Sequence, residues 1–258
     1  MTLYFNSLGN NGHLGNQMFQ YAALRGIANQ KGFDWKIPPK SLFGRSYSLR
    51  SSIYECFELS SLDDSHTGIN LDSPTITEHS HGYDDWMVTH VLDGDNIDGY
   101  FQSPKYFNEI EDLIREDFTF TRDVVYGASS PPTDFCAMHV RRTDYVGNGL
   151  HHTNLTSSYY EKAMEVLDPK KVIVFSDDQE WCRSHKFFGK FIVSSNNEYV
   201  DLYLMQNATQ HIIANSSFSW WGAWLAKSKH VVAPSNWFGP ALSHLNTDDY
   251  YLDGWNIV

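Results

Sequence analysis

Three clusters of polar residues directly follow predicted buried strands, and their side chains are of the types that bind phosphate. The clusters are Arg141–Asp144, Ser176–Asp178 and Asn215–Ser217. An arginine pair supplies permanent charge and forked donors that suit a pyrophosphate. The serine pair opens a predicted helix, whose first turn has free N–H groups and a positive dipole end. Each cluster alone is also explained by a helix cap or an ion pair, but together they predict a nucleotide site.

Strands and helices alternate along the second half of the chain, and this alternation decides where the clusters lie. Predicted strands are residues 135–140, 171–175, 191–193, 211–214 and 230–233, and predicted helices are residues 159–167, 180–185, 200–208 and 219–226. Such alternation is typical of βαβ units and a parallel sheet. Ligands bind at the carboxyl ends of the strands in these sheets, which is where all three clusters fall.

The first half of the chain begins with the same kind of pattern. A short apolar strand at residues 3–5 leads through a turn that contains glycine into a helix starting near Leu14. Residues 34–100 have little periodic signal, and residues 108–117 predict a short charged helix. The segment at 126–133 has the Gly, Ser and Pro composition of a linker. We therefore expect one domain at residues 1–130 and a second at residues 131–258.

The charge balance excludes several classes of partner. The 258 residues carry a net charge of −12 with a pI near 5.3, which makes nucleic acid or an anionic membrane a poor general ligand. No apolar run is long enough to span a bilayer, and the N-terminus lacks the features of a signal peptide. We expect a cytoplasmic protein without a transmembrane segment, and peripheral association with a membrane stays open.

Patterns that bind metals or cofactors are weak. There is no P-loop motif, and the glycine-containing loop at residues 9–15 does not fit the dinucleotide pattern. Asp93-Gly94-Asp95 matches the DxD pattern of metal-dependent sugar transferases, but an acidic chain meets it easily and we assign it to a surface turn. The histidine pairs at residues 79–81 and 151–152 lack a third ligand at helical spacing. The sequence predicts neither a metal site nor a cofactor.

Six segments form an ordered series of longer motifs. They are Gly12–Ala22, Gly99–Phe107, His139–Val146, Phe175–Trp181, Asp201–Leu225 and Pro234–Phe238. This series resembles the motifs of the α-1,2-fucosyltransferases, glycosyltransferase family 11. The segment at 139–144 and the serine pair are also similar to α-1,6- and protein O-fucosyltransferases, whereas the segments GNQMFQYA and SFSWWGAW indicate the α-1,2 family in particular.

The resemblance implies a fold and a division of labour. It implies an α/β, GT-B-like architecture in which two Rossmann-like domains face a cleft. Residues 1–130 would form the N-terminal, acceptor-side domain, and residues 131–258 the C-terminal domain that binds GDP-fucose. Transfer would invert the anomeric centre and require no metal.

The resemblance also implies roles for residues of the donor site. By similarity to the α-1,6 enzymes, His139 and Asp201 would bond the guanine. Arg141 would hold the β-phosphate, while Ser216 and Ser217 would hold phosphate oxygens. Each role has a physical reason, because the leaving diphosphate gains negative charge as the glycosidic bond breaks.

Four more residues complete the expected donor site. Arg142 and Asp177 belong to the same strand-end motifs as Arg141 and are included for that reason. Gly15 and Asn16 would approach the diphosphate or the fucose from the opposite domain.

The three tryptophans at 220, 221 and 224 have helical spacing, and we expect them to pack their helix against the sheet.

The sequence leaves two candidates for the catalytic base. The acceptor hydroxyl needs a group that takes its proton, and besides Arg141 the catalytic candidates are Asp144 and His152. Asp144 could instead be a brace for Arg142 or a turn cap. His152 could be a residue of a surface loop.

The activity that the resemblance implies is that of a galactoside α-1,2-fucosyltransferase. It would move L-fucose from GDP-β-L-fucose to the 2-hydroxyl of a terminal galactose on a β-galactoside glycan. One alternative is the same fold with another linkage or donor. Another is a catalytically silent module that binds a GDP-sugar or a glycan, although the intact His139, Arg141 and Asp201 argue against silence.

Overall fold

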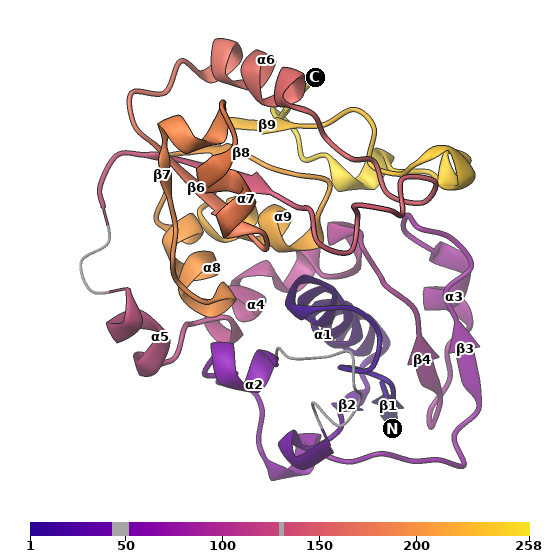
Figure 1. The fold of residues 1–258 in the computed structure, drawn as a ribbon. Coiled ribbons are helices and arrows are strands. Elements are labelled where there is room, and N and C mark those ends of the chain that lie inside the picture. The colour runs from indigo at the N-terminus through magenta and orange to yellow at the C-terminus, as the bar shows by residue number, and fades with distance from the viewer. Residues whose placement is uncertain (43–51, 129–131) are drawn as a thin grey trace. The chain divides into compact units, whose positions relative to one another are not determined.

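A computed structural model describes residues 1–42, 52–128 and 132–258 of the chain (Figure 1). These residues divide into two compact units. The first contains residues 1–121 and 246–250, and the second contains residues 122–245 and 251–258. The expected domain boundary between residues 130 and 131 lies outside the described residues.

The first unit is built on a four-stranded parallel sheet. Its strands are β1 (Thr2–Tyr4), β2 (Asp34–Lys36), β3 (Thr75–Thr77) and β4 (Asn96–Asp98), in the order β2-β1-β4-β3. Its helices are α1 (Leu14–Lys31), α2 (Ile53–Cys56), α3 (Asp85–His90) and α4 (Glu111–Asp117). The predicted order of strand, glycine turn and helix is confirmed by β1 and α1, and the charged helix by α4.

Helix α1 lies in the interior of this unit. Its residues from Leu14 to Ala28 are almost all buried, and the helix ends at Gly32 in a left-handed conformation with φ of 67°. Gly26 permits a close approach, because a Cβ atom there would lie 1.9 Å from the carbonyl oxygen of Tyr106. A glycine is therefore required where this helix crosses the turn at Pro104–Tyr106.

The second unit is built on a six-stranded parallel sheet. Its strands are β5 (Cys136–Val140), β6 (Val172–Ser176), β7 (Ile192–Val193), β8 (Gln210–Ile212), β9 (Val231–Ala233) and β10 (Asn256–Ile257), in the order β10-β9-β8-β5-β6-β7. Its helices are α5 (Arg122–Gly127), α6 (Ser157–Leu167), α7 (Gln179–Ser184), α8 (Glu198–Gln206) and α9 (Ser217–Leu225). The predicted strands β5 to β9 and helices α6 to α9 are confirmed to within a few residues, while β10 was not predicted.

Alternate residues of the central strands bury into two separate cores. Met138 and Val140 of β5 pack with residues of α6 and α7 on one face, including Tyr160. Ala137 and Phe175 face the other way and pack with α8 residues. The sheet is thus covered on both faces, as its nearly continuous apolar strands require. The predicted α/β class is confirmed.

Two further expectations concern single segments. The tryptophans at 220, 221 and 224 are buried and contact one another, so they belong to the interior of the second unit. Among the described residues, no helix combines the length and the hydropathy that crossing a bilayer would need.

Candidate functional site

The structure brings the three polar clusters to one edge of the second sheet. Strand β5 pairs with β6 on one side and with β8 on the other, all in parallel. The cluster at 141–144 follows β5, Asp177 follows β6, and the cluster at 215–217 lies between β8 and α9. The prediction that these residues share the carboxyl edge of neighbouring strands is confirmed.

Arg141 is held in place by two carboxylates. Its Nη2 atom lies 2.7 Å from Oδ1 of Asp144, and its Nη1 atom lies 3.2 Å from Oδ2 of Asp177. Burial acts against the charge, but Asp177 and Asp144 raise the pKa of Arg141 above its ordinary value. The guanidinium is therefore a fixed cation, and Asp144 braces Arg141 rather than Arg142.

Arg142 is held by helix α7. Its guanidinium carbon lies 3.4 Å from the centre of the Trp181 ring, and its Nε atom lies 3.3 Å from a carboxylate oxygen of Asp178. A cation over a tryptophan face is attracted by the ring. These contacts fasten the start of the loop after β5 to α7, a role that the sequence did not indicate.

Asp177 organises the same loop. Its carboxylate accepts hydrogen bonds from the backbone N–H groups of Arg142 at 2.9 Å and Thr143 at 3.0 Å, and from the Thr143 hydroxyl. Burial by itself would raise the pKa of Asp177, but Arg141 and these hydrogen bonds hold it below its ordinary value. Both oxygens are thus used to shape the loop that carries Arg141.

His139 and Asp201 are both buried. His139 lies at the end of β5 beside Phe218 of α9, and among the described residues its Nδ1 atom has no hydrogen-bond partner. Burial lowers the pKa of His139 to about 4. Asp201 on α8 accepts a 2.5 Å hydrogen bond from Ser194, and burial raises its pKa to about 7. The histidine is therefore neutral at neutral pH, whereas the carboxyl group titrates there.

The amino end of α9 carries the predicted serine pair. Ser216 occupies the cap position, with φ of −143°, but its side chain makes no capping hydrogen bond. Ser217 is the first residue of the helix, and Ser219 bonds back to the carbonyl groups of Ala214 and Ser216. A helix start of this kind has a positive dipole end, which favours a phosphate group.

Asn215, a member of the predicted cluster at residues 215–217, connects the site residues in a way that the sequence did not indicate. Its buried amide group donates to the carbonyl oxygens of Thr153 at 3.0 Å and Trp237 at 2.7 Å. Its own carbonyl accepts a 2.9 Å hydrogen bond from the Tyr145 hydroxyl. The segment after β5 is thereby fixed to the amino end of α9.

The two candidate bases lie in different environments. His152 stacks on Tyr145 with ring centres 4.2 Å apart, and its backbone pairs with that of Phe238. Arg141 lies over the same tyrosine, 5.5 Å from its centre. Burial lowers the pKa of His152 despite the nearby Asp144. His152 is thus a positioned, half-buried imidazole, whereas Asp144 is engaged by Arg141.

Gly15 and Asn16 lie in the first turn of α1, in the first unit. The side chain of Gln102 donates a 2.8 Å hydrogen bond to Oδ1 of Asn16. The turn before the helix needs a glycine at position 12, where φ is +83° and a Cβ atom would lie 2.1 Å from Nδ2 of Asn16. The glycine-containing motif therefore fixes the orientation of the Asn16 side chain.

A partly buried carboxyl group supports the neighbouring motif of the first unit. Glu78 accepts hydrogen bonds from the backbone N–H groups of Tyr100 and Phe101, both 2.9 Å long, and from the Tyr106 hydroxyl. Phe101 has a left-handed backbone, with φ of 54°. Burial raises the pKa of Glu78 to about 7. No sequence pattern indicated Glu78, because residues 34–100 lack a periodic signal.

The carboxylates of the acidic DxD segment accept hydrogen bonds from backbone N–H groups. Asp93 accepts a 2.7 Å hydrogen bond from the N–H group of Thr2, and Asp95 accepts one of the same length from Leu92. Gly94, between them, has φ of 88°. The assignment to a turn is confirmed. Within residues 1–42, 52–128 and 132–258, no three acidic, histidine or cysteine side chains are grouped as a metal would need.

Comparisons with known proteins agree with this geometry. The model of a family described as glycosyl transferase family 11 matches residues 95–258. An alpha-1,2-colitosyltransferase of Escherichia coli is 29% identical over 289 residues, covering 95% of each chain. A galactoside 2-alpha-L-fucosyltransferase, SEC1 of Bos taurus, is 25% identical over 85% of this chain and 64% of its own length.

The fold has a counterpart among solved structures. The crystal structure of the fucosyltransferase NodZ from Bradyrhizobium superposes with a TM-score of 0.54, covering 87% of this chain and 93% of NodZ. At 11% identity this likeness concerns the fold alone. It confirms the predicted GT-B-like class built from two Rossmann-like units.

Proposed function

The chain belongs to glycosyl transferase family 11, and from that premise we propose that it transfers L-fucose from GDP-β-L-fucose to the 2-hydroxyl of a terminal galactose. The observation that carries the proposal is the placement of His139, Arg141 and Ser216 at one edge of the second sheet. The product would be an α-1,2-linked fucoside formed with inversion, and the reaction would need no metal. The names of the two relatives support the linkage.

In this proposal the second unit holds the leaving group. Arg141 and the amino end of α9 would bind the diphosphate, and their hold would strengthen as negative charge develops on it. Arg141 is suited to this role because Asp144 and Asp177 fix its position before any ligand arrives. The fucosyl group would pass through an oxocarbenium-like state, as in other glycosyl chemistry.

Guanine recognition would use the two buried titratable groups. An ionised Asp201 can accept from two guanine N–H groups, and a neutral His139 offers the ring nitrogen that lacks a protein partner. Both side chains lie on the face of the sheet that α8 and α9 cover. Gly15 and Asn16 stay proposed contacts of the diphosphate or the fucose, and substitution of Asn16 tests them.

His152 is the better of the two candidate bases. Its lowered pKa keeps the imidazole neutral at pH 7, so that it can accept the proton of the acceptor hydroxyl. Asp144 has one oxygen committed to Arg141. A His152→Gln variant would then lose kcat while its KM for the donor stays unchanged.

The experiment that tests the proposal measures GDP release in EDTA. The purified protein is incubated with GDP-fucose, with and without lactose as a β-galactoside. Release that depends on lactose would support fucosyl transfer, and unaided slow release would support the donor site but not this acceptor. Donor binding without any turnover would instead support a silent GDP-sugar-binding module.

GDP-colitose is a second donor to be tested in the same assay. The relative that covers 95% of this chain is named for transfer of colitose, a sugar that differs from fucose in lacking the 3-hydroxyl. Parallel reactions with GDP-fucose and GDP-colitose would show which donor has the higher kcat/KM. We expect GDP-fucose to be preferred, and the reverse order would replace fucose by colitose in the proposal.

A further inference from the structure

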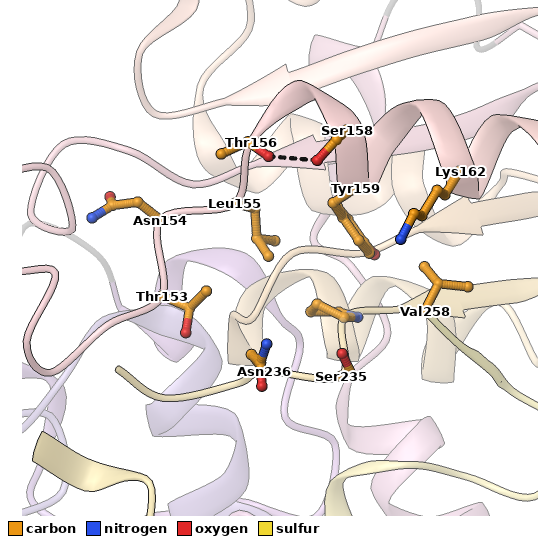
Figure 2. Close-up of a pocket in the computed structure, with 11 residues that line it drawn as sticks. Thr153, Asn154, Leu155, Thr156, Ser158, Tyr159, Lys162, Ser235, Asn236 and Val258 are labelled. Atoms are coloured by element: carbon orange, nitrogen blue, oxygen red, sulfur yellow. Dashed lines mark hydrogen bonds between the residues drawn. The ribbon is translucent and has the colours of Figure 1, made fainter. Parts of the chain in front are cut away.

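A polar groove of the second unit lies outside the residues assigned to the donor. It has a volume of about 230 Å³ and begins where β9 ends. Residues 153–156 and helix α6 form one wall, and residues 234–236 together with Val258 form the other. Figure 2 shows Leu155, Lys162 and Asn236 directed into the space between these walls.

The lining of the groove has the chemistry of a site for a neutral polyol. Its polar side chains are hydroxyl and amide groups and one amine, and none of them is a carboxylate: Thr153, Asn154, Thr156, Ser158, Lys162, Ser235 and Asn236. In the described part of the chain, no hydrogen bond or ion pair involves the side chain of Lys162 or Asn236. Leu155, Tyr159 and Pro234 add an apolar surface, which suits the C–H face of a sugar ring.

The walls of the groove are fixed without a ligand. The Tyr159 hydroxyl donates to the carbonyl groups of Ile213 at 2.5 Å and Val232 at 3.2 Å. Thr153 donates a 2.8 Å hydrogen bond to the carbonyl group of Phe238. A preformed wall lowers the entropy that a ligand must lose on binding.

The groove adjoins the proposed reaction centre in the sequence and through one hydrogen bond. Its first lining residue, Thr153, follows His152, and the Thr153 carbonyl accepts from Asn215, the residue before Ser216. A glycan that presents a hydroxyl to His152 could therefore extend into the groove. A volume of about 230 Å³ is smaller than the roughly 300–1,000 Å³ of pockets for drug-sized ligands, and it suits a single pyranose ring.

We propose that this groove binds a neutral sugar of the acceptor glycan, the one next to the galactose that receives fucose. The inference rests on the proposed function. It assigns to Lys162 and Asn236 hydrogen bonds with hydroxyl groups of that sugar, and it makes the groove a determinant of acceptor length.

The test compares a short acceptor with longer ones. Lys162→Ala and Asn236→Ala are assayed with methyl β-D-galactoside and with lactose and a tetrasaccharide ending in the same β-galactose. Each variant should lose about five- to tenfold in kcat/KM for the longer acceptors, as expected for one lost hydrogen bond. Activity on methyl galactoside and KM for GDP-fucose should stay unchanged. Glu161→Ala, on the same helix and outside the groove, is the matched control.

Two outcomes would overturn the groove assignment. One is an equal loss on the short and long acceptors, and the other is no loss in either variant. Saturation-transfer NMR of the tetrasaccharide without donor gives a second readout, in which the wild-type signal should weaken in both variants. If the wild type transfers no fucose, the proposed function fails, and the NMR comparison alone then decides whether the groove binds sugar.

Discussion

At the scale of single residues, Arg141 combines a permanent charge with a fixed position. Asp144 and Asp177 each take one of its terminal nitrogens, and Tyr145 lies beneath the guanidinium. A planar fork held in this way can meet two phosphate oxygens at once, which an ammonium group cannot do. The same tyrosine stacks with His152, so the proposed phosphate ligand and the proposed base share a support.

Arg141→Lys should therefore lose most of the activity although it keeps the charge. We expect kcat to fall about 10²- to 10³-fold, the usual consequence of removing one donor that stabilises developing charge. Turnover is followed by GDP release at saturating GDP-fucose. Arg115→Lys, on helix α4 of the first unit, is the control and should behave like the wild type. Near-normal turnover of Arg141→Lys would remove Arg141 from the proposed role.

The raised pKa of Asp201 predicts a pH dependence of donor binding. The carboxyl group is half protonated near pH 7 in the free protein, and only its ionised form accepts from guanine N–H groups. The affinity for GDP should therefore fall as the pH drops below 7, by about tenfold per unit once the group is protonated. Calorimetric titration at pH 5.5 to 8 measures this.

The matched variant for this prediction is Asp201→Asn. It should bind GDP more weakly than the wild type at pH 8, with little change between pH 5.5 and 8. Wild-type affinity that is constant or rises towards low pH would show that Asp201 does not bind the guanine as a carboxylate.

At the scale of elements, the segment from Arg141 to Thr153 is shaped by side chains from its neighbours. Asp177 accepts from the N–H groups of Arg142 and Thr143, Trp181 of α7 lies against the Arg142 guanidinium, and Asn215 donates to the carbonyl group at the far end. These contacts explain how a segment without regular structure can position reactive groups. They also explain why the sequence predicted the clusters but not their pairing, since no periodic pattern specifies a loop conformation.

Loss of the Asp177 carboxylate should destabilise the second unit. Asp177→Asn would leave the N–H groups of Arg142 and Thr143 without a charged acceptor, and we expect a cost of about 1–3 kcal/mol in the free energy of unfolding. Because the pKa of Asp177 is lower in the folded state than its ordinary 3.8, its contribution is complete above that value and is lost as the pH falls through the folded pKa.

Urea unfolding at pH 7 and at a pH well below 3.8 measures both parts of this prediction. The difference between wild type and Asp177→Asn should shrink at the lower pH. Asp253→Asn, an exposed site of the same unit, serves as the control. Equal stability of wild type and Asp177→Asn at pH 7 would mean that the loop is held by other contacts.

Close packing between α1 and the turn at residues 104–106 predicts a strict need for Gly26. A methyl group at this position would collide with the Tyr106 carbonyl oxygen and the backbone of Phe107. Gly26→Ala should lose about 1–3 kcal/mol of stability even though alanine favours helices, because the backbone must move. Thermal unfolding is compared with Gln30→Ala at the exposed end of the same helix. A stabilised Gly26→Ala would show that the helix and the turn can separate without cost.

The sequence predicted the second unit better than the first for a physical reason. Strands β5 and β6 are five buried residues long and are separated by helices, so their apolar runs are easy to recognise. Strands β2, β3 and β4 have only three residues each, which is too short for a period to be detected. The same holds for the site, since the strand-end clusters were predicted, whereas the contacts that Tyr145 and Asn215 make between them were seen only in the structure.

At the scale of the whole molecule, a chain of net charge −12 must bind a dianionic leaving group by local means. The structure provides a braced arginine and an uncapped helix end at one edge of a parallel sheet. Membership in glycosyl transferase family 11 and the GT-B-like fold agree with that arrangement. These features together support the transfer of fucose to a galactose 2-hydroxyl that we propose.

The linkage of the product tests this claim most directly. The protein is incubated with GDP-fucose and lactose in EDTA, and the product is examined by NMR. The measurement is the correlation across the glycosidic oxygen, from the fucose anomeric proton to the carbon of the acceptor that carries the fucose. The account predicts an α-fucoside with a correlation to C-2 of galactose. A fucoside linked to any other carbon, or a β-linked product, would contradict it.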